Sequence, residues 1–76
     1  MAKIVEVIWE DSCSIANQWM RPNGELEPSH CKSVGYLVSK NKKRIVIAQN
    51  YNDESGEVHN QFIIPKGCIR SIREIK

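Results

Sequence analysis

The stretch FIIPKGCIRSIREI, from Phe62 to Ile75, decides the fold of this chain. Its apolar start, in which Phe62 is expected to face the core, ends at Pro65. Pro65 lacks the backbone N–H that a sheet ladder requires. Ile69, Ile72 and Ile75 then recur every three residues. Because a segment this short makes a poor isolated helix, we expect one 3₁₀ turn followed by a short last strand.

Four more strands are expected upstream of this turn. At the start of the chain Val5, Val7 and Trp9 share one face of a strand at period two, and Glu6 lies on the other face. Gly35 within an apolar run indicates a close approach of another backbone. The predicted strands are residues 4–9, 33–39, 44–49 and 60–64, with polar turns at 40–43 and 50–57. Asn41 in the first of these turns suits a left-handed conformation.

Length and composition indicate one small soluble domain that spans residues 1–76. The chain has 76 residues, 8.7 kDa and a formal charge of +2, and no apolar run approaches the roughly 20 residues of a membrane helix. A domain of this size leaves little room for a cofactor fold with a deep cleft. Three cysteines and no secretory segment favour reduced thiols and a cytoplasmic location.

The predicted order of strands resembles the small five-stranded barrel of the SH3-like and Sm-like class, with a long first loop at residues 11–32. Within this loop, residues 14–20 could form a short helix that Pro22 ends. A second resemblance, to small uncharacterised phage and prophage proteins, rests on short apolar pieces of the chain. It implies a phage-type accessory protein in the host cytosol and brings no known active site. These pieces are VIWEDS (7–12), the loop residue Trp19, SVGYLV (33–38), IVIA (45–48) and IPKGCI (64–69).

The leading functional hypothesis is a binding module without catalysis that engages a host or phage protein through the loop 11–32. Trp9, Asp11, Ser12 and Trp19 lie in or beside that loop. Aromatic faces and a carboxylate are typical of peptide-binding or ligand-binding grooves. The structural alternative is that Trp9 fills one barrel end, Asp11 caps a turn and Trp19 holds the loop in place.

A second hypothesis is nucleic-acid binding by the basic hairpin at residues 40–44. Lys40, Lys42, Lys43 and Arg44 lie together at one turn, and each phosphate that they neutralise would release counterions. The structural alternative is a solvated turn whose lysines protect a sheet edge from unwanted pairing.

A third hypothesis is an oligomer that sequesters a small nucleotide-like ligand, with Arg70 or Arg73 facing the phosphate. We expect a homo-oligomer because a core this small seldom supplies more than about 3–5 kcal/mol. Apolar residues also remain on outer faces, namely Ile4, Ile8, Leu37 and Ile63.

No enzyme site, metal site or cofactor is predicted. The cysteines and histidines lack the paired spacing of structural zinc sites. The glycines are isolated, so no phosphate-binding loop is expected.

Overall fold

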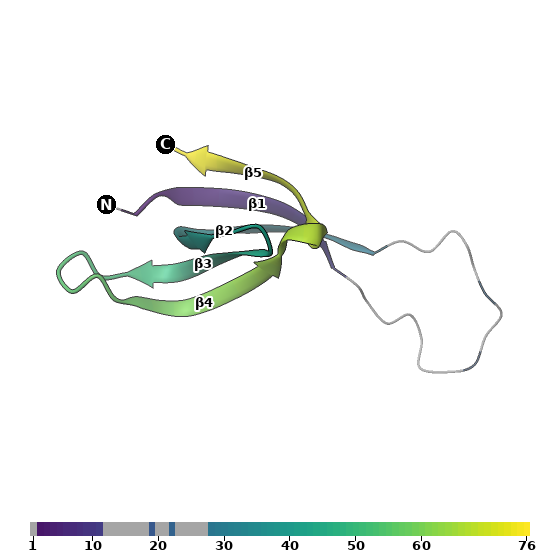
Figure 1. The fold of residues 1–76 in the computed structure, drawn as a ribbon, viewed down its shortest axis with the longest axis horizontal. Helices are drawn as coiled ribbons and strands as arrows, with labels where there is room; N and C mark the ends of the chain where they lie inside the picture. The colour runs from purple at the N-terminus through teal and green to yellow at the C-terminus, as the bar shows by residue number, and fades with distance from the viewer. Residues whose placement is uncertain (1, 12–18, 20–21, 23–27) are drawn as a thin grey trace.

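The computed structural model of the chain describes residues 2–11, 19, 22 and 28–76 (Figure 1). The described chain forms five antiparallel strands in one sheet, ordered β4-β3-β2-β1-β5, with a single 3₁₀ turn. The all-β prediction is therefore confirmed. The elements are β1 (Ile4–Asp11), β2 (Ser29–Lys40), β3 (Arg44–Tyr51), β4 (Val58–Pro65), η1 (Lys66–Cys68) and β5 (Ile69–Ile75).

The turn that was expected after Pro65 is present as η1, and the last strand follows it directly. Ile69 pairs with Trp9 and Ile75 pairs with Ile4, so β5 returns antiparallel to the first strand. Together, η1 and β5 confirm the prediction for residues 62–75.

Strand β2 begins four residues earlier than predicted. Ser29 pairs with Asp11 and Cys31 pairs with Trp9, which extends the β1–β2 ladder into the region that was expected to be loop. These added residues are mostly polar and carry no apolar alternation, so the sequence pattern did not mark them. The short helix considered for residues 14–20 lies outside the described residues, Trp19 apart.

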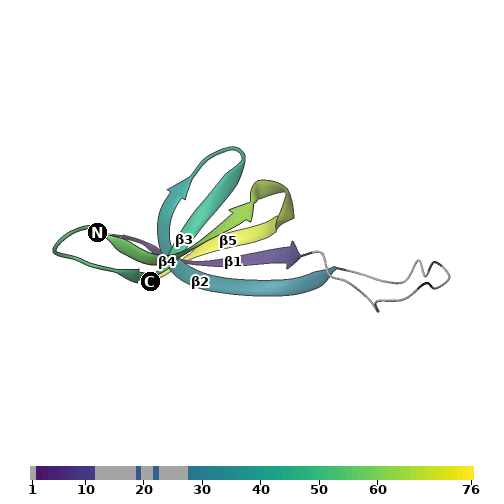
Figure 2. The ribbon, with the colours of Figure 1, turned by 90° about the horizontal axis from the view of Figure 1, so that it is seen from below.

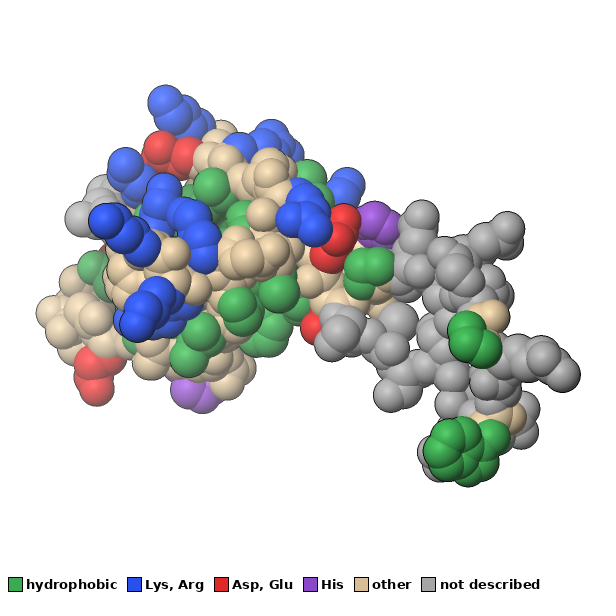
Figure 3. Space-filling model, turned by 45° about the vertical axis from the view of Figure 1, so that its right-hand side comes forward, with side chains coloured by type: hydrophobic (Ala, Val, Ile, Leu, Met, Phe, Trp, Pro, Cys, Tyr) green, Lys and Arg blue, Asp and Glu red, His purple; other side chains and the backbone are tan. Residues whose placement is uncertain are grey.

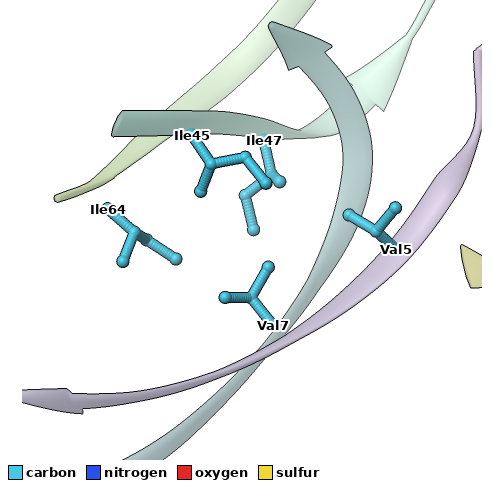
Figure 4. Packing of buried hydrophobic residues seen from close by; sticks show 5 residues of the cluster. All are labelled: Val5, Val7, Ile45, Ile47 and Ile64. Carbon is cyan, nitrogen blue, oxygen red and sulfur yellow. The ribbon is translucent and has the colours of Figure 1, made fainter. Parts of the chain in front are cut away.

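The core lies on the concave side of the curled sheet (Figure 4). Val5 and Val7 of β1 meet Ile45 and Ile47 of β3 and Ile64 of β4, and each of these side chains is at most 4% exposed. Burying one such side chain contributes about 1.5–3 kcal/mol, so this cluster is the main source of stability. Five further side chains pack against it: Trp9, Leu37, Cys68, Ile69 and Ile72.

The predicted positions of two side chains, Leu37 and Phe62, are wrong. Leu37, expected on an outer face, packs against the core, because it pairs with Ile47 and shares its side of the sheet. Phe62, expected in the core, is 45% exposed, and its ring packs against Trp9 with centroids 5.6 Å apart. This contact links β1 and β4, which are not neighbours in the sheet.

Gly35 lies where β2 passes closest to β3. A Cβ at this position would stand 2.8 Å from the carbonyl oxygen of Ala48, well inside van der Waals contact. The predicted close approach of another backbone is confirmed. Beyond this point β2 bends, and Figure 2 shows the β2–β3 hairpin and the β4–β5 connection rising on the same side of β1.

The sheet is not closed by hydrogen bonds between β4 and β5, which are its two edges. No helix among the described residues has the length and apolarity that a membrane span requires.

Candidate functional site

The β2–β3 turn holds its basic side chains on a locally fixed backbone. The Asn41 side-chain oxygen Oδ1 accepts hydrogen bonds from the backbone N–H groups of Lys43 (2.8 Å) and Arg44 (2.9 Å). The Asn41 N–H in turn donates to the Arg44 carbonyl oxygen at 3.0 Å. We had expected Asn41 to adopt a left-handed conformation, and this is wrong: the side chain shapes the turn by bonding to the backbone instead.

A fifth cation joins this turn from a distant part of the sequence. The Lys66 backbone N–H donates to the Lys43 carbonyl oxygen at 2.8 Å, because the β3–β4 register pairs Arg44 with Pro65. We call these five residues the basic end. They are Lys40, Lys42, Lys43, Arg44 and Lys66, and Figure 3 shows Lys and Arg side chains gathered on one part of the surface.

Within the basic end the four lysines are exposed and Arg44 is half-buried. The Arg44 guanidinium Nη1 donates to the Ser39 hydroxyl oxygen at 2.9 Å, which fixes its direction. No ion pair formed by the described residues involves any of the five side chains. Their charges therefore remain available to an anionic partner.

The opposite end of β3 is acidic. Asp53, Glu54 and Glu57 are exposed in the β3–β4 turn, where the Asn52 Oδ1 accepts the Glu54 N–H at 2.9 Å. Strand β3 has eight residues, so roughly 25 Å separates the two turns at about 3.3 Å per residue. The described residues thus place positive charge at one end of β3 and negative charge at the other.

The residues of the predicted loop site do not form one cluster. Trp9 is half-buried, and its indole Nε1–H donates to the Ser33 hydroxyl oxygen at 3.0 Å. The Trp19 side chain is 103% exposed, so it makes no contact with Trp9. Asp11 is exposed at the end of β1, and Ser12 lies outside the described residues.

The arginines of the third hypothesis are both engaged with glutamates on the outer face of β1. Arg70 Nη2 donates to Glu10 Oε2 at 2.7 Å, and Arg73 Nε donates to Glu6 Oε1 at 2.9 Å. These hydrogen bonds lower the pKa of both glutamates and raise the pKa of both arginines. A phosphate would have to displace a carboxylate to reach either guanidinium.

A groove of about 440 Å³ lies where β2 separates from β3 and is lined by residues of β2, β3 and β4. At its edge Asn60 adopts a left-handed conformation with φ of 58°, and its Nδ2 donates to Gln49 Oε1 at 3.0 Å. The lining residues are Ser33, Val34, Ile47, Ala48, Gln49, Asn60, Gln61 and Phe62. None of them is charged, and sequence reasoning did not identify this groove.

Cys31 and Cys68 are free thiols. The described residues contain no group of three or more His, Cys, Asp and Glu side chains placed to hold a metal ion. No protein-family model, curated protein or solved structure matches this chain.

Proposed function

We propose that this chain is a nucleic-acid-binding protein that contacts phosphates through its basic end. One observation carries the proposal: the backbone N–H of Lys66, after β4, bonds to the carbonyl oxygen of Lys43 in the β2–β3 turn. This bond brings a fifth cationic residue to the hairpin. Neighbouring cations that form no ion pair with a described carboxylate are typical of a phosphate-binding surface. The lack of exposed aromatic rings within the basic end favours backbone contacts over base recognition.

The expected affinity follows from counterion release. Five neutralised phosphates on a single strand give a slope of log K against log salt near −3.5, at about 0.7 per phosphate. Binding of this nonspecific kind has a Kd of roughly 10⁻⁴–10⁻⁶ M at physiological salt.

The test is a fluorescence anisotropy titration of a labelled 20-nucleotide oligo-dT strand at several salt concentrations between about 50 and 200 mM. The doubly reversed variant Lys42→Glu/Lys43→Glu should lose binding, while its melting temperature stays unchanged because both side chains are exposed. Lys76→Glu is the matched control, because the seven residues of β5 separate it from η1. Absence of binding by the wild-type protein at low salt would refute the proposal.

The fold type that best accommodates these elements is an SH3-like barrel. Three features support it: the last strand pairs with the first, a 3₁₀ turn precedes that strand, and β1, β3 and β4 enclose one core. Nuclear Overhauser contacts between backbone protons of β4 and β5 would establish closure. A sheet with both edges exposed to solvent would contradict it.

Protein binding through the loop 11–32 is the second candidate, and the observation that favours it is the fully exposed indole of Trp19. A large aromatic ring in solvent is typical of an interface anchor. Trp19→Ala should therefore leave the melting temperature unchanged and abolish recovery of a partner protein. A drop of several degrees would instead assign the ring to the core.

Self-association is a further proposal, and it rests on two exposed sheet edges and on an apolar side chain at the surface. Strands β4 and β5 are sheet edges, and Ile63 on β4 is 60% exposed. Edge strands pair readily with other chains. Native mass spectrometry at micromolar concentration should give a multiple of 8.7 kDa, and a monomer would contradict the expectation.

A further inference from the structure

The two halves of β2 have different neighbours. Residues 36–40 pair with β3 in a ladder that begins at Tyr36 opposite Ala48. Residues 29–35 pair with β1, and no other described strand pairs with them. Among the residues that the structure describes, no strand pairs with the other edge of residues 32–35, which borders the uncharged groove.

The register shows which backbone groups lie on that open edge. The Leu37 N–H donates to the Lys3 carbonyl oxygen at 2.8 Å, which makes these two residues a hydrogen-bonded pair of the β1–β2 ladder. Hydrogen-bonded and non-hydrogen-bonded pairs alternate along an antiparallel ladder. Gly35 and Ser33 therefore direct their N–H and C=O groups toward β1, whereas those of Val34 and Lys32 point away from it.

The side chains that line the groove suit an uncharged ligand, whereas the exposed Lys32 side chain lies on the β2 edge outside that lining. Val34 is 53% exposed and Phe62, across the groove, is 45% exposed. Gln49 and Asn60 also line the groove, and their side chains form a hydrogen bond of 3.0 Å to each other. In a chain with 26% charged residues, an eight-residue lining without a charge favours a partner segment that is itself uncharged.

We propose that an uncharged, extended peptide segment of a partner protein binds this groove and adds a strand to the open edge of β2. The backbone groups of Val34 and Lys32 recur every second residue, which is the spacing that an added strand satisfies. Val34 and Phe62 then contact alternate side chains of the peptide. This surface is separate from the basic end, so the inference goes beyond the proposed nucleic-acid function.

The first test is amide hydrogen exchange of the free protein, resolved by residue. Ser33 and Gly35 should be protected because their N–H groups bond to β1, whereas Val34 and Lys32 should exchange rapidly. Protection of Val34 and Lys32 in the free monomer would show that the edge is already occupied by the chain itself, and would overturn the proposal.

The second test is selection of binders from a library of random heptapeptides displayed on ribosomal complexes. Selected peptides should be free of charged residues, and should protect the Val34 and Lys32 amides when bound. A selection without binders, or with binders that leave these two amides unprotected, contradicts the proposal.

Two variants separate strand addition from simple hydrophobic contact. Val34→Pro removes the outward N–H alone, since this amide does not bond to β1, and edge positions tolerate proline. It should weaken the selected peptide at least tenfold, whereas Val34→Thr, which keeps the N–H, should weaken it less than threefold. The Lys42→Glu/Lys43→Glu protein should bind the peptide normally, so failure here is distinguishable from failure of nucleic-acid binding.

Discussion

Val7 and Glu6 are neighbours on β1, yet their side chains lie in opposite environments. Val7 is 0% exposed within the apolar cluster, whereas the Glu6 carboxylate on the outer face accepts a hydrogen bond from Arg73. Both contacts join β1 to other strands. An exposed ion pair is screened by solvent and contributes little, while a buried aliphatic side chain contributes about 1.5–3 kcal/mol. The apolar cluster on the concave face therefore supplies most of the stability, and the ion pairs on the outer face add a small contribution.

The same contrast on β4 gives the prediction with the largest effect. Ile64 is 0% exposed and its neighbour Ile63 is 60% exposed. Ile64→Ala should lower the free energy of unfolding by about 2–5 kcal/mol, because it removes transfer energy and leaves a cavity. Ile63→Ala should change it by less than about 0.5 kcal/mol. Urea denaturation of both variants measures the difference, and equal losses would show that the two faces are wrongly assigned.

A smaller loss is expected at the bend of β2. Gly35→Ala places a Cβ 2.8 Å from a backbone oxygen that moves only with β3, so we expect destabilisation of about 1–3 kcal/mol. Gly67→Ala is the control, since its Cβ would meet no atom within 4 Å. Thermal unfolding followed by circular dichroism compares the two. If Gly35→Ala is as stable as Gly67→Ala, the close approach of β2 and β3 is wrong.

The outer face gives the smallest effect, and it depends on pH. The hydrogen bonds from Arg73 and Arg70 lower the pKa of Glu6 and Glu10 below the usual glutamate value in the folded chain. Their stabilisation is thus present above the pKa of the unfolded chain and is lost as the pH falls through the lowered value.

The melting temperature of the wild-type protein should therefore fall more steeply below about pH 4.5 than that of Glu6→Gln/Glu10→Gln. Glu54→Gln serves as the control, because no ion pair among the described residues involves its carboxylate. Identical acid profiles for the wild-type protein and the double variant would show that the pairs contribute nothing.

The sequence predicted those parts of the fold that depend on local pattern. Alternation assigned Val5 and Val7 to the core face, and Pro65 marked the end of β4 and the start of the turn. The polar residues that begin β2 escaped prediction because pairing with β1, rather than apolar periodicity, makes them a strand. Neighbours set by tertiary register are invisible to such patterns.

The candidate site shows the same limit. The hairpin lysines were identified because they are adjacent in the sequence. Lys66 was not, because only the β3–β4 register brings it to Lys43. The open edge of β2 was not predicted either, because it depends on the β2–β3 ladder ending at Tyr36. The sequence offered one signal for Lys66: this cation lies just after the predicted strand 60–64, at the end of that strand.

The most direct test of the account is the salt dependence of oligo-dT binding by Lys66→Ala, because this residue belongs to the basic end only through the fold. We predict severalfold weaker binding and a slope that is less negative by about 0.7, the loss of one phosphate contact. Lys43→Ala should behave alike, and Lys76→Ala should match the wild-type protein. If Lys66→Ala binds with the wild-type affinity and slope, the basic end is not one binding surface.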